Sequence, residues 1–572
     1  MKRAGFAAVA TALVALGANG EAEAQAAYRL SPIMEQGAVR ALAVELRFIG
    51  EADGDTLLNL PTGGGRETTL FRHIADVKAS GAQVQATDAP DRLRLVHAPG
   101  AEIRVTYRLN SAFEVAPSAG AAEDRYHPMI VGDWFSVLGR AAFIRPDWSS
   151  DTPDTPASFA WRGFPSDWTL ASDLEHGDLR LGDIGQAILL GGTDLAVTRL
   201  GAETAPTRIA LLGDWDFDRA RFTDDLSRIM TATRAFWGVE ARPFLVALTP
   251  LRAEAGAYSL SGTGLADAFS VYASTDAAAE DLAPLLAHEH FHSWMPLAVG
   301  GLDQEPEALG YWLSEGFTDF YTLRMLVRAD VVSTEEAVRH FNDGLEAYWT
   351  SPVRERPNAE IPAHFSSDTG FQRLPYQRGA ALAALWDHRL RVSGTAAGLD
   401  DVLRAMAVDQ AGGDAVSRFT RGMTARGVDV APDLKRHVED GEMIVLPSDL
   451  LEPCGRLEMV ERALFHRGFD IDATMAADSV VQGVDPSGPA FGAGLRDGMR
   501  LVRREGVLRN DPDLEIIYRV ATAEGEKVVA WLPQGPDRVT MQRLVASPEA
   551  EGEGRAQCRL ALAGLQEASP PR

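Results

Sequence analysis

The chain has 572 residues, of which 46% are hydrophobic and 24% charged, and its formal net charge is −26. This length is too great for a single hydrophobic core and predicts about three domains. The composition is typical of a folded, soluble protein. The negative charge argues against nucleic acid and anionic membrane surfaces as partners, because both would repel the chain.

The first residues have the pattern of a secretory signal peptide. Met1-Lys2-Arg3 precedes an apolar run that reaches Ala18, and Ala24-Gln25-Ala26 matches an A-x-A cleavage site. We therefore expect residues 1–26 to be removed, so that the mature chain starts at Ala27 and is periplasmic or secreted. An uncleaved anchor is the alternative, although the run is short for a membrane span. No later segment is long and apolar enough to cross a membrane.

Residues 27–210 have the alternating pattern of β-strands. Apolar residues occupy every second position between residues 41 and 49, and runs at 93–96 and 102–107 behave similarly. The first run places four side chains on one face: Leu42, Val44, Leu46 and Phe48. Clusters of Gly, Pro and Asp separate the runs. This pattern predicts a β-sandwich-like N-terminal domain.

Residues 211–450 have a different pattern, with one clear strand and several helices. Apolar residues recur at helical spacing before Gly238, and residues 243–248 form an apolar run typical of a buried strand. The rest of this segment is mainly helical. We expect a multidomain α+β protein whose second domain has a small sheet, a helical half and a cleft between them.

The most informative motif of the chain is H-E-x-x-H at residues 288–292. Residues four apart on a helix lie on the same face, so His288 and His292 can present two ring nitrogens to one ion. Glu315, which lies 23 positions after His292, is the natural third ligand. Catalytic zinc takes three protein ligands and leaves a fourth position open for water. The spacing therefore predicts a site for one zinc ion per chain.

Two further carboxylates complete this predicted site. Glu289 points away from the ligand pair but lies near the open position, where it can act as the general base toward water. Asp319 lies one turn after Glu315, and we expect it to accept a hydrogen bond from His288. His290 falls on another face of the helix, which predicts a solvated or structural role.

These motifs resemble those of a known family. H-E-H-F-H-S-W followed by W-L-S-E-G-F-T-D-F-Y looks like the glycyl aminopeptidases, a family of gluzincin zinc metallopeptidases related to larger zinc aminopeptidases and to thermolysin. The resemblance implies a thermolysin-like catalytic domain at residues 211–450, after a β-sandwich-like domain. L-P-Y-Q-R-G at residues 374–379 is similar to the family's P-Y-x-[KR]-G element. It implies that the hydroxyl of Tyr376 stabilises the oxyanion formed during hydrolysis.

One stretch departs from the family's pattern. The family has G-G-L-E-H-x-x-S before the zinc helix, and this chain has T-G-L-A-D-A-F-S at residues 263–270. Gly264 and Leu265 remain candidates for an edge strand that pairs with a substrate backbone. In the family's pattern, the position of Ala266 is occupied by a Glu that resembles the residue binding the substrate's free amino terminus. The methyl side chain of Ala266 cannot bind an ammonium group. Asp267 either substitutes for that Glu or is an ordinary loop acid.

Residues 451–560 form a third predicted domain. Residues 480–484 have the pattern of a strand, and the following S-G-P-A-x-x-A-G-L stretch at residues 487–495 resembles a PDZ domain. Met499 stands where that family has Asp. The resemblance implies binding of peptide C-termini beside a loop at residues 467–469. The alternative is a packed structural module that binds nothing.

Cys454 and Cys558 are the only cysteines, one near each end of the third domain. In an oxidising compartment they can form a disulfide that ties these ends together, and two buried free thiols are the alternative. Residues after 546 are rich in Glu, Gly and Ala, which predicts a frayed tail that includes residues 561–572.

These observations favour a secreted or periplasmic zinc metallopeptidase that acts on peptides, with the resemblance pointing to an aminopeptidase. The alternative within this class is an endopeptidase for short peptides, whose cleft is opened by Ala266. The alternative from a different functional class is a non-catalytic protein with a vestigial zinc site, which binds peptides through the PDZ-like domain.

Overall fold

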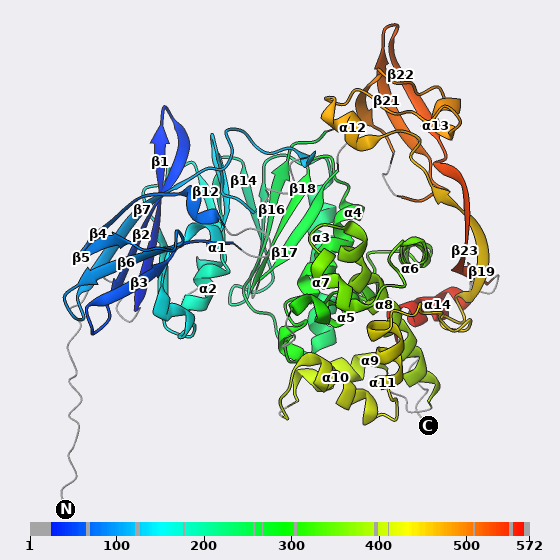
Figure 1. The fold of residues 1–572 in the computed structure, drawn as a ribbon, viewed down its shortest axis with the longest axis horizontal. Coiled ribbons are helices and arrows are strands. Elements are labelled where there is room, and N and C mark those ends of the chain that lie inside the picture. Colours follow the sequence, from blue (N-terminus) through cyan, green and yellow to red (C-terminus); the bar gives the residue numbers. More distant parts are fainter. Residues whose placement is uncertain are drawn as a thin grey trace, which may run out of the picture.

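The computed structural model describes residues 25–565, except for ten short gaps. The gaps lie at residues 64–68, 121–125, 176–177, 255–257, 266, 303–305, 394–397, 410, 507–509 and 548–552. The predicted signal peptide lies almost wholly outside the described residues. Figure 1 shows a sheet-rich N-terminal part, a helical centre and a C-terminal module. Among the described residues, no helix is both long enough and apolar enough to span a membrane.

The N-terminal part contains three sheets. A five-stranded sheet has the order β11-β1-β2-β7-β4, and two four-stranded sheets have the orders β10-β3-β6-β5 and β12-β13-β9-β8. The predicted alternation holds in β2, where Leu42, Val44, Leu46 and Phe48 are buried in one core. The strand bounds are β1 Ala26–Glu35, β2 Ala38–Ile49, β3 Asp55–Asn59, β4 Ile74–Ser80, β5 Ala82–Ala86, β6 Arg92–His97, β7 Glu102–Asn110, β8 Met129–Val131, β9 Trp134–Leu138, β10 Arg145–Pro146, β11 Ala157–Trp161, β12 Thr169–Ser172 and β13 Ile188–Gly192.

A further five-stranded sheet carries one side of the site, in the order β14-β15-β16-β18-β17. Helix α3 (Arg219–Trp237) and helix α4 (Ala279–Phe291) pack against this sheet through one apolar core. Helix α3 starts at an Asp218 cap and ends at Gly238 in the left-handed conformation (φ 67°). The strands are β14 Leu195–Leu200, β15 Thr207–Leu212, β16 Phe244–Leu251, β17 Leu260–Gly264 and β18 Ala268–Ser274.

The helical half surrounds a second large core. Four of its aromatic rings contact one another at centroid distances of 5.1–6.4 Å: Trp312, Phe317, Trp386 and Phe419. These aromatic contacts hold together the two long helices that flank the site, α5 and α8. The helices are α5 Tyr311–Arg328, α6 Thr334–Thr350, α7 Ile361–His364, α8 Thr369–Val392, α9 Leu399–Ala407, α10 Ala415–Thr424 and α11 Ala431–Asp433, followed by a π-helical turn at Leu434–Glu439.

The C-terminal module is built on a long antiparallel ribbon, β19 (Gly455–Phe465) with β23 (Gln534–Ala546). A three-stranded sheet and two short helices complete it: β20 Arg500–Arg504, β21 Ile516–Thr522, β22 Gly525–Trp531, α12 Ile471–Ala476 and α13 Pro489–Gly492. The predicted strand at residues 480–484 was wrong, because only single bridges form there and Asp478 and Ser479 have positive φ.

The loop that was expected to hold a peptide C-terminus is packed. The carbonyl of Arg467 accepts a hydrogen bond from the Trp531 indole, and Phe469 lies in the module's core. The module also contacts the helical half and the segment that follows β18. Arg462 pairs with Glu346 of α6 at 2.8 Å, and Arg504 pairs with Asp276 at 3.6 Å.

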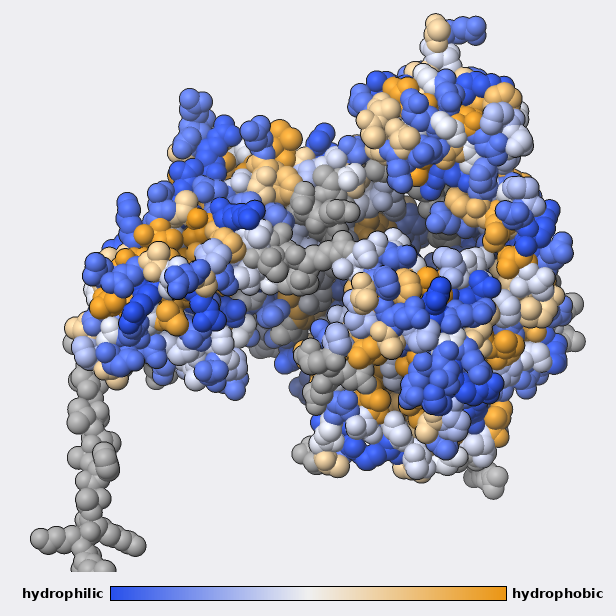
Figure 2. All heavy atoms as spheres, in the orientation of Figure 1, coloured by the Kyte–Doolittle hydropathy of each residue, from blue (hydrophilic) through white to orange (hydrophobic). Residues whose placement is uncertain are grey.

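The chain then returns to the helical half as α14 (Glu553–Ala563), which packs against α5 and α6. Cys454 and Cys558 form a disulfide, and both are buried. The prediction of a frayed tail was therefore wrong for residues 553–563. The buried side chains of Leu562 and Ala563 give this helix a tertiary environment that its composition does not reveal. Figure 2 shows polar side chains over most of the visible face, as the high charge leads us to expect.

Candidate active site

Three donor atoms converge between α4 and α5. The Nε2 atoms of His288 and His292 lie 3.0 Å apart, and the Oε2 atom of Glu315 lies 3.3 Å from the first and 3.1 Å from the second. All three lie within 4.8 Å of one another, and no other such group occurs among the described residues. Two imidazoles and one carboxylate are a donor set that suits catalytic zinc.

The outer nitrogens of both histidines already have partners. The Nδ1 atom of His288 lies 2.9 Å from Oδ1 of Asp319, and Nδ1 of His292 lies 2.9 Å from the carbonyl oxygen of Met295. Each acceptor holds the proton on Nδ1, which leaves the Nε2 lone pairs free to face the shared point. The donor set therefore fits a zinc ion both in its chemistry and in its orientation.

Glu289 is pressed against edge strand β17. A methyl group added at Gly262 would lie 2.7 Å from Cγ of Glu289, and one added at Gly264 would lie 3.4 Å from its Oε2. Only glycine at position 262 allows this approach. Glu289 is 8% exposed beside the donor set, and this burial raises the pKa of its carboxyl group. The sequence analysis predicted that Gly264 belongs to the strand beside the site, but it missed Gly262, which lies two positions earlier.

Strand β17 is an edge strand of its sheet. In the part of the chain that the structure describes, β17 pairs only with β18, and Ser259 and Leu265 make their backbone hydrogen bonds on that inner side. Because pairing alternates, the backbone groups of Gly262 and Gly264 face outward. The hydroxyl of Tyr126, from the N-terminal part, donates to the outward carbonyl of Gly262 at 3.2 Å. Sequence reasoning missed Tyr126, since 136 residues separate it from its partner.

Tyr376 lies next to the donor set, against His288. Its ring stacks on that of His288, with 6.1 Å between the centroids and 17° between the planes. Burial, followed by the charges of Glu315 and Asp319, raises the pKa of Tyr376 far above its usual value. The phenol therefore keeps its proton and can donate a hydrogen bond.

Two glycines set the distance between the helices that carry these groups. An added methyl at Gly379 of α8 would lie 1.9 Å from the carbonyl oxygen of Trp312, and one at Gly316 of α5 would lie 2.3 Å from Cα of Gly379. The backbones of α5 and α8 are thus in direct contact. This contact lies beside Glu315 and one turn after Tyr376.

Gly264, Leu265 and Asp267, which the sequence predicted to bind substrate, each contact a different part of the protein. Gly264 lies against Glu289, but the N–H of Leu265 is bonded to the carbonyl of Ala268 within the hairpin turn. Asp267 faces Arg242, with 3.4 Å between the charged atoms. Ala266 lies outside the described residues.

His290 is fully buried, between the rings of Phe244 and Trp294 at 5.3 and 5.2 Å. Burial lowers the pKa of His290 to about 3, so the ring is neutral. Of the two roles that the sequence allowed, this environment corresponds to the structural one.

Comparison with known proteins agrees with this geometry. The M61 glycyl aminopeptidase family model matches residues 281–367, which include His288, His292 and Glu315. The aminopeptidase N family protein from Idiomarina loihiensis has the same fold at 16% identity, with a TM-score of 0.63 over 92% of this chain and 98% of its own. The M1 zinc metallopeptidase from Deinococcus radiodurans aligns at 17% identity, with a TM-score of 0.44 over 74% of this chain and 94% of its own. No curated protein sequence matches the chain.

Proposed function

We propose that this chain, a zinc metallopeptidase of aminopeptidase-like type, removes amino-terminal residues from short peptides. The observation that carries the proposal is the convergence of His288, His292 and Glu315, with Glu289 and Tyr376 beside them. We assign the first three as zinc ligands. Zinc supplies Lewis-acid chemistry at such a site, since it polarises a carbonyl and lowers the pKa of water.

The chain's own residues then perform the proton transfers. Glu289 is positioned to accept a proton from the attacking water and to return it to the leaving amine. Tyr376 is positioned to donate a hydrogen bond to the carbonyl oxygen as negative charge develops there. The N–H of Gly262 and the carbonyl of Gly264, which face outward, can pair with an extended peptide beside Glu289. Asp319 acts through His288, whose ring it orients.

A second candidate is an endopeptidase that acts on short peptides. An aminopeptidase needs an acid for the substrate's ammonium group, and Asp267 instead pairs with Arg242. The replacement of the family's Glu by Ala266 favours the same alternative. The family match supports the aminopeptidase, because it names that activity.

Mass-spectrometric cleavage of a mixed peptide library, half of it N-acetylated, separates the two candidates. Loss of single amino-terminal residues from free peptides alone supports the aminopeptidase. Internal cuts in blocked peptides at similar rates support the endopeptidase. A protein that holds zinc and cleaves neither set contradicts both.

The location and the role of the C-terminal module belong to the same proposal. We propose export to the periplasm or medium after cleavage at Ala26, which N-terminal sequencing of the protein made in a bacterial host checks.

We also propose that the PDZ-like module serves as a structural support. The packed loop at residues 467–469 favours this role over the binding of peptide C-termini. Measurable binding of C-terminal peptides to a zinc-free protein would contradict it.

A further inference from the structure

A cavity of about 1160 Å³ opens from the donor set into the helical half. His288, Glu289 and Tyr376 line its near end, and it continues between α5, α6 and α8. Its far wall consists of the segment at residues 446–453 and of α14. The disulfide between Cys454 and Cys558 joins these two segments directly beside that wall. Drug-sized ligands fill pockets of about 300–1,000 Å³, so this space exceeds what a single small side chain needs.

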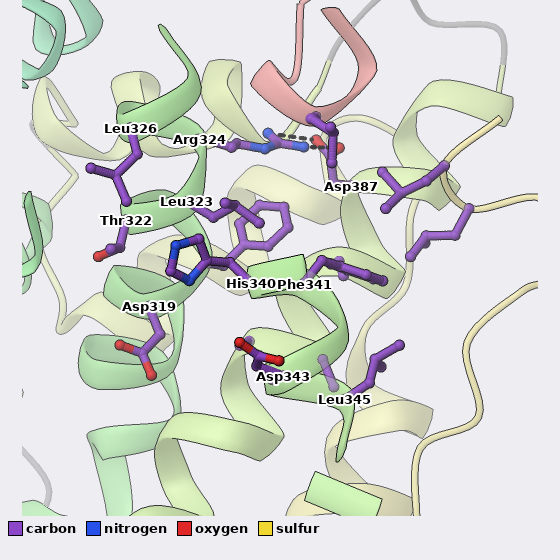
Figure 3. Close-up of a pocket in the computed structure, with 18 of the residues that line it drawn as sticks. Asp319, Thr322, Leu323, Arg324, Leu326, His340, Phe341, Asp343, Leu345 and Asp387 are labelled. Atoms are coloured by element: carbon purple, nitrogen blue, oxygen red, sulfur yellow. Dashed lines mark hydrogen bonds and ion pairs between the residues drawn. The ribbon is translucent and has the colours of Figure 1, made fainter. Parts of the chain in front are cut away.

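The chemistry of the wall changes along the cavity. Asp319 and Asp343 lie toward the near end, and Arg324 and Asp387 are joined at the opposite end beside α14 (Figure 3). Between these ends, aliphatic and aromatic side chains line the cavity together with the polar side chains of Thr322 and His340. The apolar members of this lining include Leu323, Phe341, Leu450 and Leu560.

The charged groups at the far end already have partners. Arg324 pairs with Asp387 and, at 3.1 Å, with Asp400. Arg391 bonds Asp387 at 2.7 Å and the carbonyl of Gly564, just after α14, at 2.9 Å. These bonds satisfy the arginines and the end of α14 together. The far end therefore holds α14 in place, and we see no need for a charged ligand there.

We infer that this cavity is a specificity pocket, which receives a large apolar side chain next to the cleaved peptide bond. The inference rests on the proposed peptidase function. It names the substrate class as short peptides with Leu, Phe or a similar residue beside the cut, in place of glycine. Each buried methylene group strengthens transition-state binding, and a single one changes kcat/KM by about 10-fold or more in a well-formed pocket.

The first test compares peptides that differ only in one flanking residue: Gly, Ala, Leu or Phe on either side of the cut. At one of the two positions, kcat/KM for Phe exceeds that for Ala by at least about 10-fold. Equal rates for all four residues at both positions overturn the inference while leaving the peptidase intact. Hydrolysis of none of the peptides overturns the proposed function instead.

The second test narrows the pocket from α6. Ala347 lines the cavity and is exposed, so Ala347→Phe adds a ring to that space without entering the core. The ratio of kcat/KM for Phe to that for Ala peptides falls about 10-fold, and Ala347→Leu gives a smaller fall. Ala425→Phe, at an exposed position outside the cavity, is the matched control and keeps the ratio. An unchanged ratio in a folded Ala347→Phe protein overturns the inference.

A binding measurement removes turnover from the comparison. Calorimetric titration of the zinc-loaded Glu289→Gln protein with Phe- and Gly-containing peptides gives their affinities without cleavage. We expect the Phe peptide to bind at least about 10-fold more tightly, and Ala347→Phe in the same background to abolish the difference. Equal affinities of both peptides contradict the pocket.

Discussion

The backbone contact between α5 and α8 makes Gly379 the most demanding position near the site. In Gly379→Ala, the added methyl would lie 1.9 Å from the carbonyl oxygen of Trp312 and 2.7 Å from Cα of Gly316. Ordinary contacts between such atoms are about 3.5 Å, so the helices must separate by roughly 1–1.5 Å. Overpacking of this kind costs about 1–3 kcal/mol of the free energy of unfolding.

That separation moves Tyr376 relative to Glu315, because each residue lies within one turn of the contact. A misplacement of about 1 Å can reduce turnover roughly 100-fold. We therefore expect Gly379→Ala to lower kcat by about two orders of magnitude and to lower the melting temperature, while zinc content stays near that of the unsubstituted protein. Steady-state kinetics, a thermal melt and metal analysis measure these three quantities.

The matched control is Gly492→Ala in α13. Gly492 is also helical, but an added methyl there would meet nothing within 4 Å. It should leave kcat and the melting temperature close to their original values. If Gly379→Ala retains both as well, the helices do not depend on this contact, and our account of how Tyr376 is positioned is wrong.

Three further predictions concern the chemistry and the stability of the chain. Glu289→Gln should retain zinc but lose turnover, because the general base is gone; full activity would refute the mechanism. Cys454→Ser opens a crosslink between residues 104 apart and should reduce the free energy of unfolding by roughly 4–5 kcal/mol, as denaturant titration can measure. Burial raises the pKa of Asp173 to about 7, so its ionisation weakens the fold as pH rises from about 4 to 7. Asp173→Asn keeps an oxygen that accepts the hydrogen bond from the N–H of Ile188. As pH rises through that range, the free energy of unfolding of this variant should increase relative to that of the original protein by up to about 1.4 kcal/mol per pH unit. A difference in melting temperature that does not change with pH would contradict this.

The donor set could be predicted from the sequence because local helix geometry determines much of it. Residues four apart on α4 must share a face, and Asp319 lies one turn after Glu315 on α5. The same holds for β2, whose alternation directly reports its buried face.

The missed features depend on contacts between distant segments. Gly262 and Tyr126 meet across 136 residues, and the direction of Asp267 follows from its partner Arg242. Helix α14 has a composition typical of a tail, but the disulfide at Cys558 and its packing against α5 and α6 stabilise it. Local propensity carries none of this information.

The central claim is that His288, His292 and Glu315 hold one zinc ion on which hydrolysis depends. Metal analysis of the purified protein, paired with peptide hydrolysis before chelation, after chelation and after zinc is added back, tests it most directly. We predict one zinc per chain, loss of hydrolysis on chelation and recovery with one equivalent of zinc, with Glu315→Ala failing to recover. Hydrolysis that persists in the metal-free protein, or zinc retained at full stoichiometry in Glu315→Ala, would contradict the account.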